Sequence, residues 1–148
     1  MAFEFRLQKV LEYREKLKVM AQEELFLSQL ELKAIQDELA RIEGEEEDLL
    51  RFQQENQRES LDALTLFSID TYRLFLQKSY QKNLVAQEKQ EEEVDEKRHK
   101  VVERWRECKI MGKLKENALN DYFLEEKILE QHVNDEISLY NYLRKDRD

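Results

Sequence analysis

The sequence predicts an all-α protein made of two long helices in an antiparallel coiled-coil hairpin. Three observations support this prediction. The 148 residues include no proline and two glycines, although globular domains usually place both residue types at tight turns. Good helix formers, namely Leu, Glu, Lys, Gln, Arg and Ala, occupy most positions. Apolar residues recur at heptad spacing in two long stretches, on either side of the more apolar segment 60–76.

The first helix is expected over about residues 3–64, where one heptad phase places apolar residues on a single seam. Its a positions are Leu11, Leu25, Leu32 and Leu39, and its d positions are Leu7, Ala21, Ile35, Ile42 and Leu49. Polar residues at Arg14, Lys18 and Ser28 share this seam. We therefore expect a helix pair that is weaker than a zipper with only apolar seam residues.

The second helix is expected over about residues 69–145, after a connection at about 61–69, and residues 1–148 form one coiled-coil domain. Ser68 is the predicted N-cap, with Phe67 packed against Tyr72 as a hydrophobic staple. The expected a positions are Tyr80, Val94, Val101, Cys108, Tyr122, Leu129 and Leu143. The expected d positions are Leu84, Trp105, Leu119, Val133 and Tyr140.

The register of an antiparallel pair fixes the sum of the paired residue numbers. The two heptad phases allow sums of about 136 to 137 or about 129 to 130. Residues 97–115 hold eight basic and two acidic residues, and the first register places them opposite 21–39, with five acidic residues and one basic. Because flanking charges select partners in coiled coils, this register is preferred. It pairs Val94 with Ile42, Val101 with Ile35, Trp105 with Leu32, and Cys108 with Ser28.

The preferred register has one unfavourable consequence. It sets the acidic run 43–48 against Glu88 and the run 91–93, where like charges repel. We expect either a weak, flared or partner-stabilised zone there, or a different register.

Composition excludes most catalytic and cofactor sites, so no enzyme activity, metal or cofactor is expected. Gly44 and Gly112 alone cannot build a phosphate-binding loop, and the single cysteine, Cys108, cannot build a disulfide framework or a thiolate zinc site. His99 and His132 have no nucleophile at a helical offset. Nucleic-acid binding is not expected, because the net charge is −9 and the one tryptophan of the basic stretch 97–115 falls on the expected seam.

No apolar run of about 18 residues is present, and the first ten residues lack the apolar core of a secretory signal. With a single cysteine, this predicts a cytosolic protein that does not insert into a membrane.

Exposed apolar surface is expected near the connection and near the N-terminus. A two-helix hairpin has one inner face, so Tyr72, Phe75 and Leu76 cannot all point into it. The same holds for Phe3, Phe5, Val10 and Leu17, which lie off the expected seam. Such patches on a slender protein are typical of docking surfaces, and self-association is the main alternative.

Four segments, in order, resemble motifs of the FliJ family of flagellar type III export proteins. They are FRLQKVLEYREKLKVMAQEEL at 5–25, YRLF at 72–75, WRE at 105–107 and EQHVNDE at 130–136. The length and the two-helix layout agree as well. The acidic run 43–48 departs from the family pattern, which has fewer charges there.

The resemblance implies a non-enzymatic stalk that couples a hexameric export ATPase to the export gate, a membrane protein. It further implies a cytoplasmic location peripheral to the inner membrane at the flagellar base, and escort of export chaperones. The residues that match gate-facing positions are Tyr72, Phe75, Leu76 and Ile42. The residues that match the ATPase-facing ends are Phe5, Arg6, Gln8, Arg14, Asp135 and Glu136.

Two alternatives stay open at this point. One is the equivalent stalk protein of a virulence type III secretion system. The other is a structural or chaperone-like coiled coil, such as a prefoldin-like hairpin or a dimeric spacer. A stalk predicts a monomer that stimulates a partner ATPase, whereas a dimer or hexamer favours the second alternative.

Overall fold

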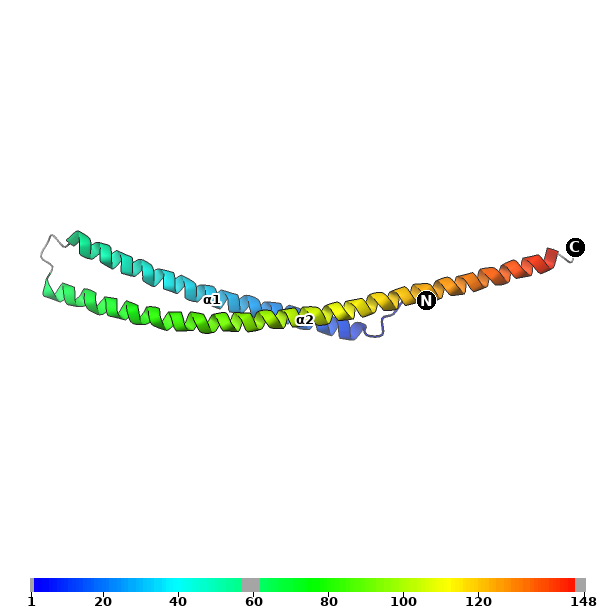
Figure 1. The fold of residues 1–148 in the computed structure, drawn as a ribbon, viewed down its shortest axis with the longest axis horizontal. Coiled ribbons are helices and arrows are strands. Elements are labelled where there is room, and N and C mark those ends of the chain that lie inside the picture. Colours follow the sequence, from blue (N-terminus) through cyan, green and yellow to red (C-terminus); the bar gives the residue numbers. More distant parts are fainter. Residues whose placement is uncertain (1, 57–61, 146–148) are drawn as a thin grey trace. The chain divides into compact units, whose positions relative to one another are not determined.

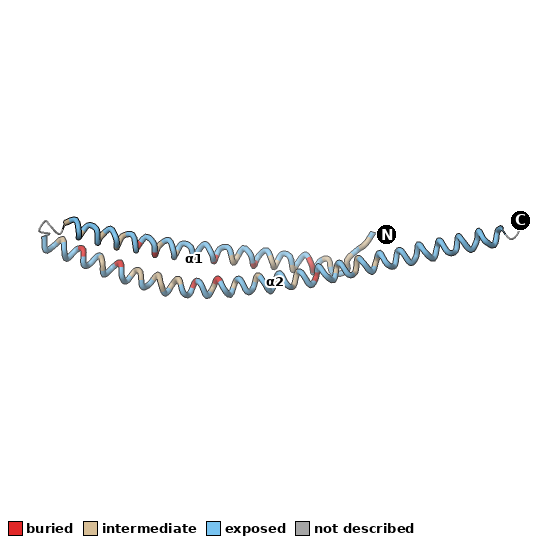
Figure 2. Tube along the Cα trace, turned by 45° about the horizontal axis from the view of Figure 1, so that its top comes forward, coloured by how far each residue is buried: buried red, intermediate tan, exposed pale blue. Residues whose placement is uncertain are grey.

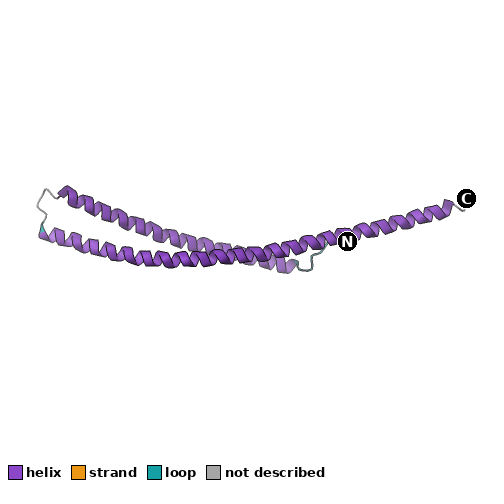
Figure 3. Cartoon of the chain, in the orientation of Figure 1, coloured by secondary structure: helices purple, strands orange, loops and turns teal. Residues whose placement is uncertain are grey.

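The computed structural model describes residues 2–56 and 62–145. Within these ranges the chain forms two α-helices and no strand (Figures 1 and 3). Helix α1 spans Gln8–Asn56 and has 49 residues, and helix α2 spans Ala63–Lys145 and has 83 residues. The all-α class and the hairpin of two long helices are therefore confirmed.

The helix ends differ from the expected ones at the start of α1, which lies five residues after the expected position 3, and near the connection. Helix α1 begins at Gln8, whose backbone N–H donates to Phe5 O at 3.0 Å, and it ends at Asn56, whose side chain donates to Phe52 O at 2.8 Å. Helix α2 begins six residues before the expected position 69. Asp62, immediately before it, accepts the first helical hydrogen bond through its carbonyl oxygen, and aspartate is a favoured N-cap residue.

Ser68 is therefore not the N-cap of the second helix. It lies inside α2, where its Oγ donates to Leu64 O at 2.9 Å. The part of the expected connection at residue 61 lies outside the described residues.

The chain divides into two compact units. The hairpin unit comprises Met20–Val102, and the terminal unit comprises Met1–Val19 together with Glu103–Asp148.

In the hairpin unit, α1 and the first part of α2 lie side by side and run in opposite directions (Figure 1). The heptad phase predicted for the first helix is correct here, because all a and d positions from Ala21 to Leu49 are buried or half-buried (Figure 2). Ile42 and Leu76 are fully buried, with 0% and 1% of their surface exposed. The core is thus a single seam one side chain thick, as two helices alone allow.

The register differs from both expected ones. Hydrogen bonds join Ser28 to Gln90, Glu43 to Tyr80 and Glu45 to Tyr72, so that paired residue numbers add up to about 120. The expected pairings of Val94 with Ile42, Val101 with Ile35, Trp105 with Leu32 and Cys108 with Ser28 are therefore wrong. Charge was a weak guide because exposed ion pairs contribute only about 0–1 kcal/mol each, less than correct packing of a seam.

The correct register also removes the expected clash of acidic runs. Residues 43–48 face the segment that contains Tyr72 and Tyr80, and two of their carboxylates accept hydrogen bonds from these tyrosines. The like-charge zone is therefore not formed in the hairpin unit.

The second seam was predicted correctly at a as far as Tyr122, whereas its d position lies one residue earlier than expected, although Leu84 and Leu119 are half-buried. Tyr80, Val94 and Val101 are buried or half-buried, as expected, but the other inner positions are Leu76, Asn83, Gln90 and Lys97. Gln90 is 9% exposed. In the terminal unit, likewise, Trp105 is 51% exposed while Arg104 and Met111 face inward. The predicted d positions lie one residue after the true ones because several true d residues are polar, and only apolar residues were counted.

In the terminal unit, Leu11 and Met111 are buried, and Phe3 packs against Tyr122 with ring centroids 5.6 Å apart. Beyond Tyr122, all residues of α2 from 123 to 145 are exposed (Figure 2). This C-terminal stretch is named the bare segment below. It includes Leu129, Val133, Tyr140 and Leu143, which the sequence placed on a seam and which are each more than half exposed.

Candidate functional site

The hairpin unit carries one candidate contact surface, named here the aromatic flank. It consists of Glu45, Asp48, Leu49 and Phe52 from α1 with Tyr72 and Phe75 from α2. The rings of Tyr72 and Phe75 are stacked, with centroids 6.2 Å apart and planes inclined by 19°. Phe75 is 63% exposed, so the pair presents an aromatic face to solvent.

The heptad geometry explains why these rings lie outside the seam. Leu76 follows Phe75 directly and is buried at an inner position, and each residue turns the helix by about 100°. Of the four expected gate residues, Tyr72 and Phe75 are exposed, whereas Leu76 and Ile42 are buried in the seam behind them. The prediction that some of this apolar group must remain outside the seam is confirmed.

A chain of polar contacts holds Tyr72 in place. Its hydroxyl donates to one carboxylate oxygen of Glu45, and the other oxygen of Glu45 accepts from Arg41. Arg41 also donates to Glu38 at 2.9 and 2.6 Å. The hydrogen bond to Glu45 raises the pKa of Tyr72, and the hydrogen bond from Arg41 lowers the pKa of Glu38.

A small open groove lies beside these groups. It has a volume of about 360 Å³ and is lined by Glu45, Asp48, Leu49, Phe52 and Tyr72. Sequence reasoning missed this groove, because only the correct register brings the acidic run next to Tyr72. The departure of residues 43–48 from the family pattern was the signal that could have pointed to it.

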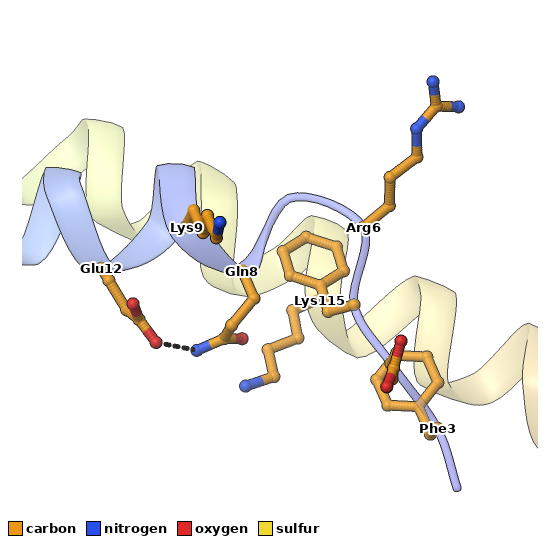
Figure 4. Close-up of a pocket in the computed structure, with 8 residues that line it drawn as sticks. Phe3, Arg6, Gln8, Lys9, Glu12 and Lys115 are labelled. Atoms are coloured by element: carbon orange, nitrogen blue, oxygen red, sulfur yellow. Dashed lines mark hydrogen bonds between the residues drawn. The ribbon is translucent and has the colours of Figure 1, made fainter. Parts of the chain in front are cut away.

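The terminal unit carries a second candidate surface at the start of the chain, named here the N-terminal pocket (Figure 4). The pocket is open, with a volume of about 810 Å³. It is lined by Phe3, Glu4, Phe5, Arg6, Gln8, Lys9, Glu12 and Lys115. Three residues expected at the ATPase-facing end, Phe5, Arg6 and Gln8, are therefore brought together here.

The side chains at this pocket differ in whether they bond to a neighbour. Gln8 Nε2 donates to Glu12 Oε1 at 3.2 Å, whereas the guanidinium of Arg6 points away from the ribbon (Figure 4). Arg14 does not line the pocket, because its Nη1 donates to Glu107 Oε2 at 2.8 Å. Glu107 Oε2 also accepts from Arg104 Nη1 at 3.1 Å. The hydrogen bond from Arg104, followed by the interaction with Arg14, lowers the pKa of Glu107.

The remaining two expected ATPase-facing residues, Asp135 and Glu136, lie on the bare segment rather than at the pocket. Around them, exposed apolar side chains repeat along the helix, and a shallow groove is formed by Leu129, Glu130, Val133 and Asn134. This segment is therefore a helix with an apolar stripe and acidic neighbours, and no other helix covers it within the described part of the terminal unit.

Among the described residues, no group of three His, Cys, Asp or Glu side chains could hold a metal ion. His99 contacts the Asp95 carbonyl oxygen at 2.7 Å through Nδ1, and His132 is exposed on the bare segment. Among the described helices, none combines the length and the apolar character needed to cross a bilayer.

The fold and the two surfaces define a class of protein: a helical hairpin with exposed apolar and aromatic side chains. A family model described as the flagellar FliJ protein matches residues 3–147. The chain therefore belongs to the FliJ family and is a component of flagellar type III export. Proteins of this family are cytoplasmic, non-catalytic export components. No curated protein and no solved structure matches the chain.

Proposed function

We propose that this protein is the central stalk of the export ATPase complex: it docks into the hexameric ATPase and couples it to the export gate. The observation that carries this proposal is the bare segment, residues 123–145 of α2, in which all residues are exposed. Leaving many apolar side chains in water is unfavourable for a protein that acts alone. A partner that surrounds this helix would bury them.

The N-terminal pocket and the bare segment supply the proposed ATPase contacts. Phe5, Arg6 and Gln8 line the pocket, and Asp135 and Glu136 lie on the bare segment. Arg14 has a structural part in this proposal, because its ion pair with Glu107 joins α1 to α2 inside the terminal unit. We assign the gate contact to the aromatic flank, where Tyr72 and Phe75 present their rings and Ile42 and Leu76 support them from the seam.

The mechanism needs no chemistry by the chain itself. A stalk that touches the subunits of a ring with unequal strength favours different conformations in different subunits, and so biases their nucleotide cycles. A gate that binds the same chain at another surface then senses that bias. The proposal places the chain as a monomer in the cytoplasm, peripheral to the inner membrane at the flagellar base. Escort of export chaperones extends the proposal on the strength of the family resemblance.

The test measures ATP hydrolysis by the purified export ATPase of the same organism, with and without the chain. The wild-type chain should raise the rate and show no hydrolysis alone. The double variant Asp135→Lys with Glu136→Lys should lose most of the stimulation, because two charges on the bare segment are reversed.

The matched control reverses an adjacent acidic pair elsewhere on α2. Glu91 and Glu92 are both exposed and belong to the hairpin unit, so Glu91→Lys with Glu92→Lys should keep the stimulation. Absence of stimulation by the wild-type chain, or equal loss in both double variants, would contradict ATPase docking through the bare segment. A dimer or hexamer in light scattering would contradict the monomeric stalk.

A further inference from the structure

The groove of the aromatic flank combines an apolar floor with an acidic rim. Leu49, Phe52 and Tyr72 supply apolar and aromatic surface, and Glu45 and Asp48 supply carboxylates. Phe75 extends the aromatic surface through its stacking on Tyr72. Phe52 is 44% exposed, so this floor is open to a partner.

The two carboxylates of the rim are not equivalent. Both oxygens of Glu45 are engaged, one by Tyr72 and one by Arg41, so Glu45 holds the tyrosine ring in its place. The side chain of Asp48 is 76% exposed, and Arg51 approaches it only to 3.9 Å. Asp48 is therefore the rim carboxylate that is open to a new cation.

The surrounding charge is strongly negative. Residues 38–55 hold seven acidic and two basic residues. Aromatic faces attract cations through their negative π surface, and carboxylates beside them add to this attraction. An acidic or purely apolar partner would gain nothing from the rim, and an acidic one would be repelled.

We propose that this groove binds an amphipathic segment of the export gate in which a lysine or arginine stands next to an apolar or aromatic side chain. The apolar side chain lies on Leu49 and Phe52, and the cation lies between Asp48 and the ring of Tyr72. Glu45 is a positioning residue, since it acts through the hydroxyl of Tyr72. The identity of the partner rests on the proposed function, whereas the chemistry of the groove rests on the residues above.

The first experiment tests the groove without the gate. The probes are two fluorescent helical peptides of equal length, one built from leucine and lysine and one from leucine and glutamate, and fluorescence anisotropy reports binding to the full chain. The lysine peptide should bind, and Asp48→Lys should weaken it at least about fivefold, because one attractive pair becomes repulsive. Asp48→Asn should weaken it less, and raised salt should weaken it further.

The matched control is Glu47→Lys, which changes the net charge by the same amount. Glu47 is exposed and adjacent to Asp48 in sequence, but it does not line the groove, because one residue turns the helix by about 100°. Equal weakening by Asp48→Lys and Glu47→Lys would overturn the inference, because general attraction to an acidic chain would then explain the binding of the lysine peptide. Equal binding of the two peptides would also overturn it. Far-UV circular dichroism of each variant verifies that the helices are intact.

The second experiment uses the purified cytoplasmic region of the gate protein. If it binds the wild-type chain and Asp48→Lys weakens binding while Glu47→Lys does not, both the groove chemistry and the gate contact are supported. If it binds all three proteins alike, the inference fails and the proposed gate contact stands. If it binds none of them while the lysine peptide selects Asp48, the gate assignment fails and the groove is a site for another cationic segment.

Discussion

The buried polar contact between Ser28 and Gln90 makes the observed register directly testable. Gln90 Nε2 donates to Ser28 O at 3.1 Å, to Ser28 Oγ at 3.0 Å and to Glu31 Oε2 at 3.2 Å. Ser28 is 1% exposed, so its hydroxyl is shielded from water while Gln90 is in place. In Gln90→Ala this hydroxyl loses its partner inside the seam, which costs about 1–3 kcal/mol.

The assay is urea unfolding of the full chain, followed by far-UV circular dichroism. Gln81→Ala is the matched control, because Gln81 is an exposed residue of the same helix and should cost less than about 0.5 kcal/mol. Replacing both partners, as Ser28→Ala with Gln90→Leu, should restore most of the stability, since no polar group is then left unpaired. A single polar pair in a coiled-coil core also specifies register, so the double variant should pair its helices less specifically.

Disulfide cross-linking tests the register independently of the free energy of unfolding. The pair Ser28→Cys with Gln90→Cys, in a Cys108→Ser background, should form a disulfide under mild oxidation. Ser28→Cys alone should not cross-link to the native Cys108. Disulfide formation with Cys108, or a loss in Gln90→Ala no larger than that in Gln81→Ala, would refute the assigned register.

Three further predictions concern the hairpin unit. Leu76→Ala should cost about 2–4 kcal/mol in urea unfolding because Leu76 is 1% exposed, whereas Phe75→Ala should cost less than about 1 kcal/mol because Phe75 is 63% exposed; similar costs would contradict the assigned faces. The hydrogen bond to Glu45 raises the pKa of Tyr72 above its ordinary 10.0, so its stabilisation is present below pH 10.0 and is lost as the pH rises through the folded-state pKa. Glu45→Gln should therefore lower the pKa of Tyr72. That pKa is measured from tyrosinate absorbance during alkaline titration, after subtraction of the signal from the matching Tyr72→Phe variant. An unchanged pKa would count against this bond. Gly44→Ala should stabilise the chain by about 0.5–1 kcal/mol in urea, because a Cβ at Gly44 meets nothing within 4 Å and alanine loses less conformational entropy on folding than glycine; destabilisation would show that the glycine is needed.

Much of the fold could be predicted from the sequence because helix propensity and heptad spacing are local properties. The seam of α1 was predicted correctly, since its d positions include Ala21, Ile35, Ile42 and Leu49. The d positions of α2 were not, because Gln90 and Lys97 occupy true inner positions while Trp105 lies outside. A pattern search that counts only apolar residues cannot find a polar seam residue whose partner lies on the other helix.

The register, and with it the candidate site, could not be derived from the sequence for a related reason. Register depends on contacts between residues that are far apart in the chain, and exposed charges discriminate weakly among registers. The one-faced seam predicted that some of the group Tyr72, Phe75 and Leu76 must stay outside it, but only the structure shows that the exposed residues are Tyr72 and Phe75. The Glu45 contact that holds Tyr72, and the groove beside it, required the pairing of the two helices.

The central claim is that one chain joins the ATPase to the gate through separate surfaces. The most direct measurement immobilises the cytoplasmic region of the gate protein and records capture of the export ATPase as the chain is added. The account predicts that the ATPase is captured only when the chain is present. Phe75→Ala should abolish this capture. The double variant Asp135→Lys with Glu136→Lys should also abolish it, although that variant still binds the gate. ATPase capture that is equal with and without the chain, or a chain that binds either partner but never both at once, would contradict the account.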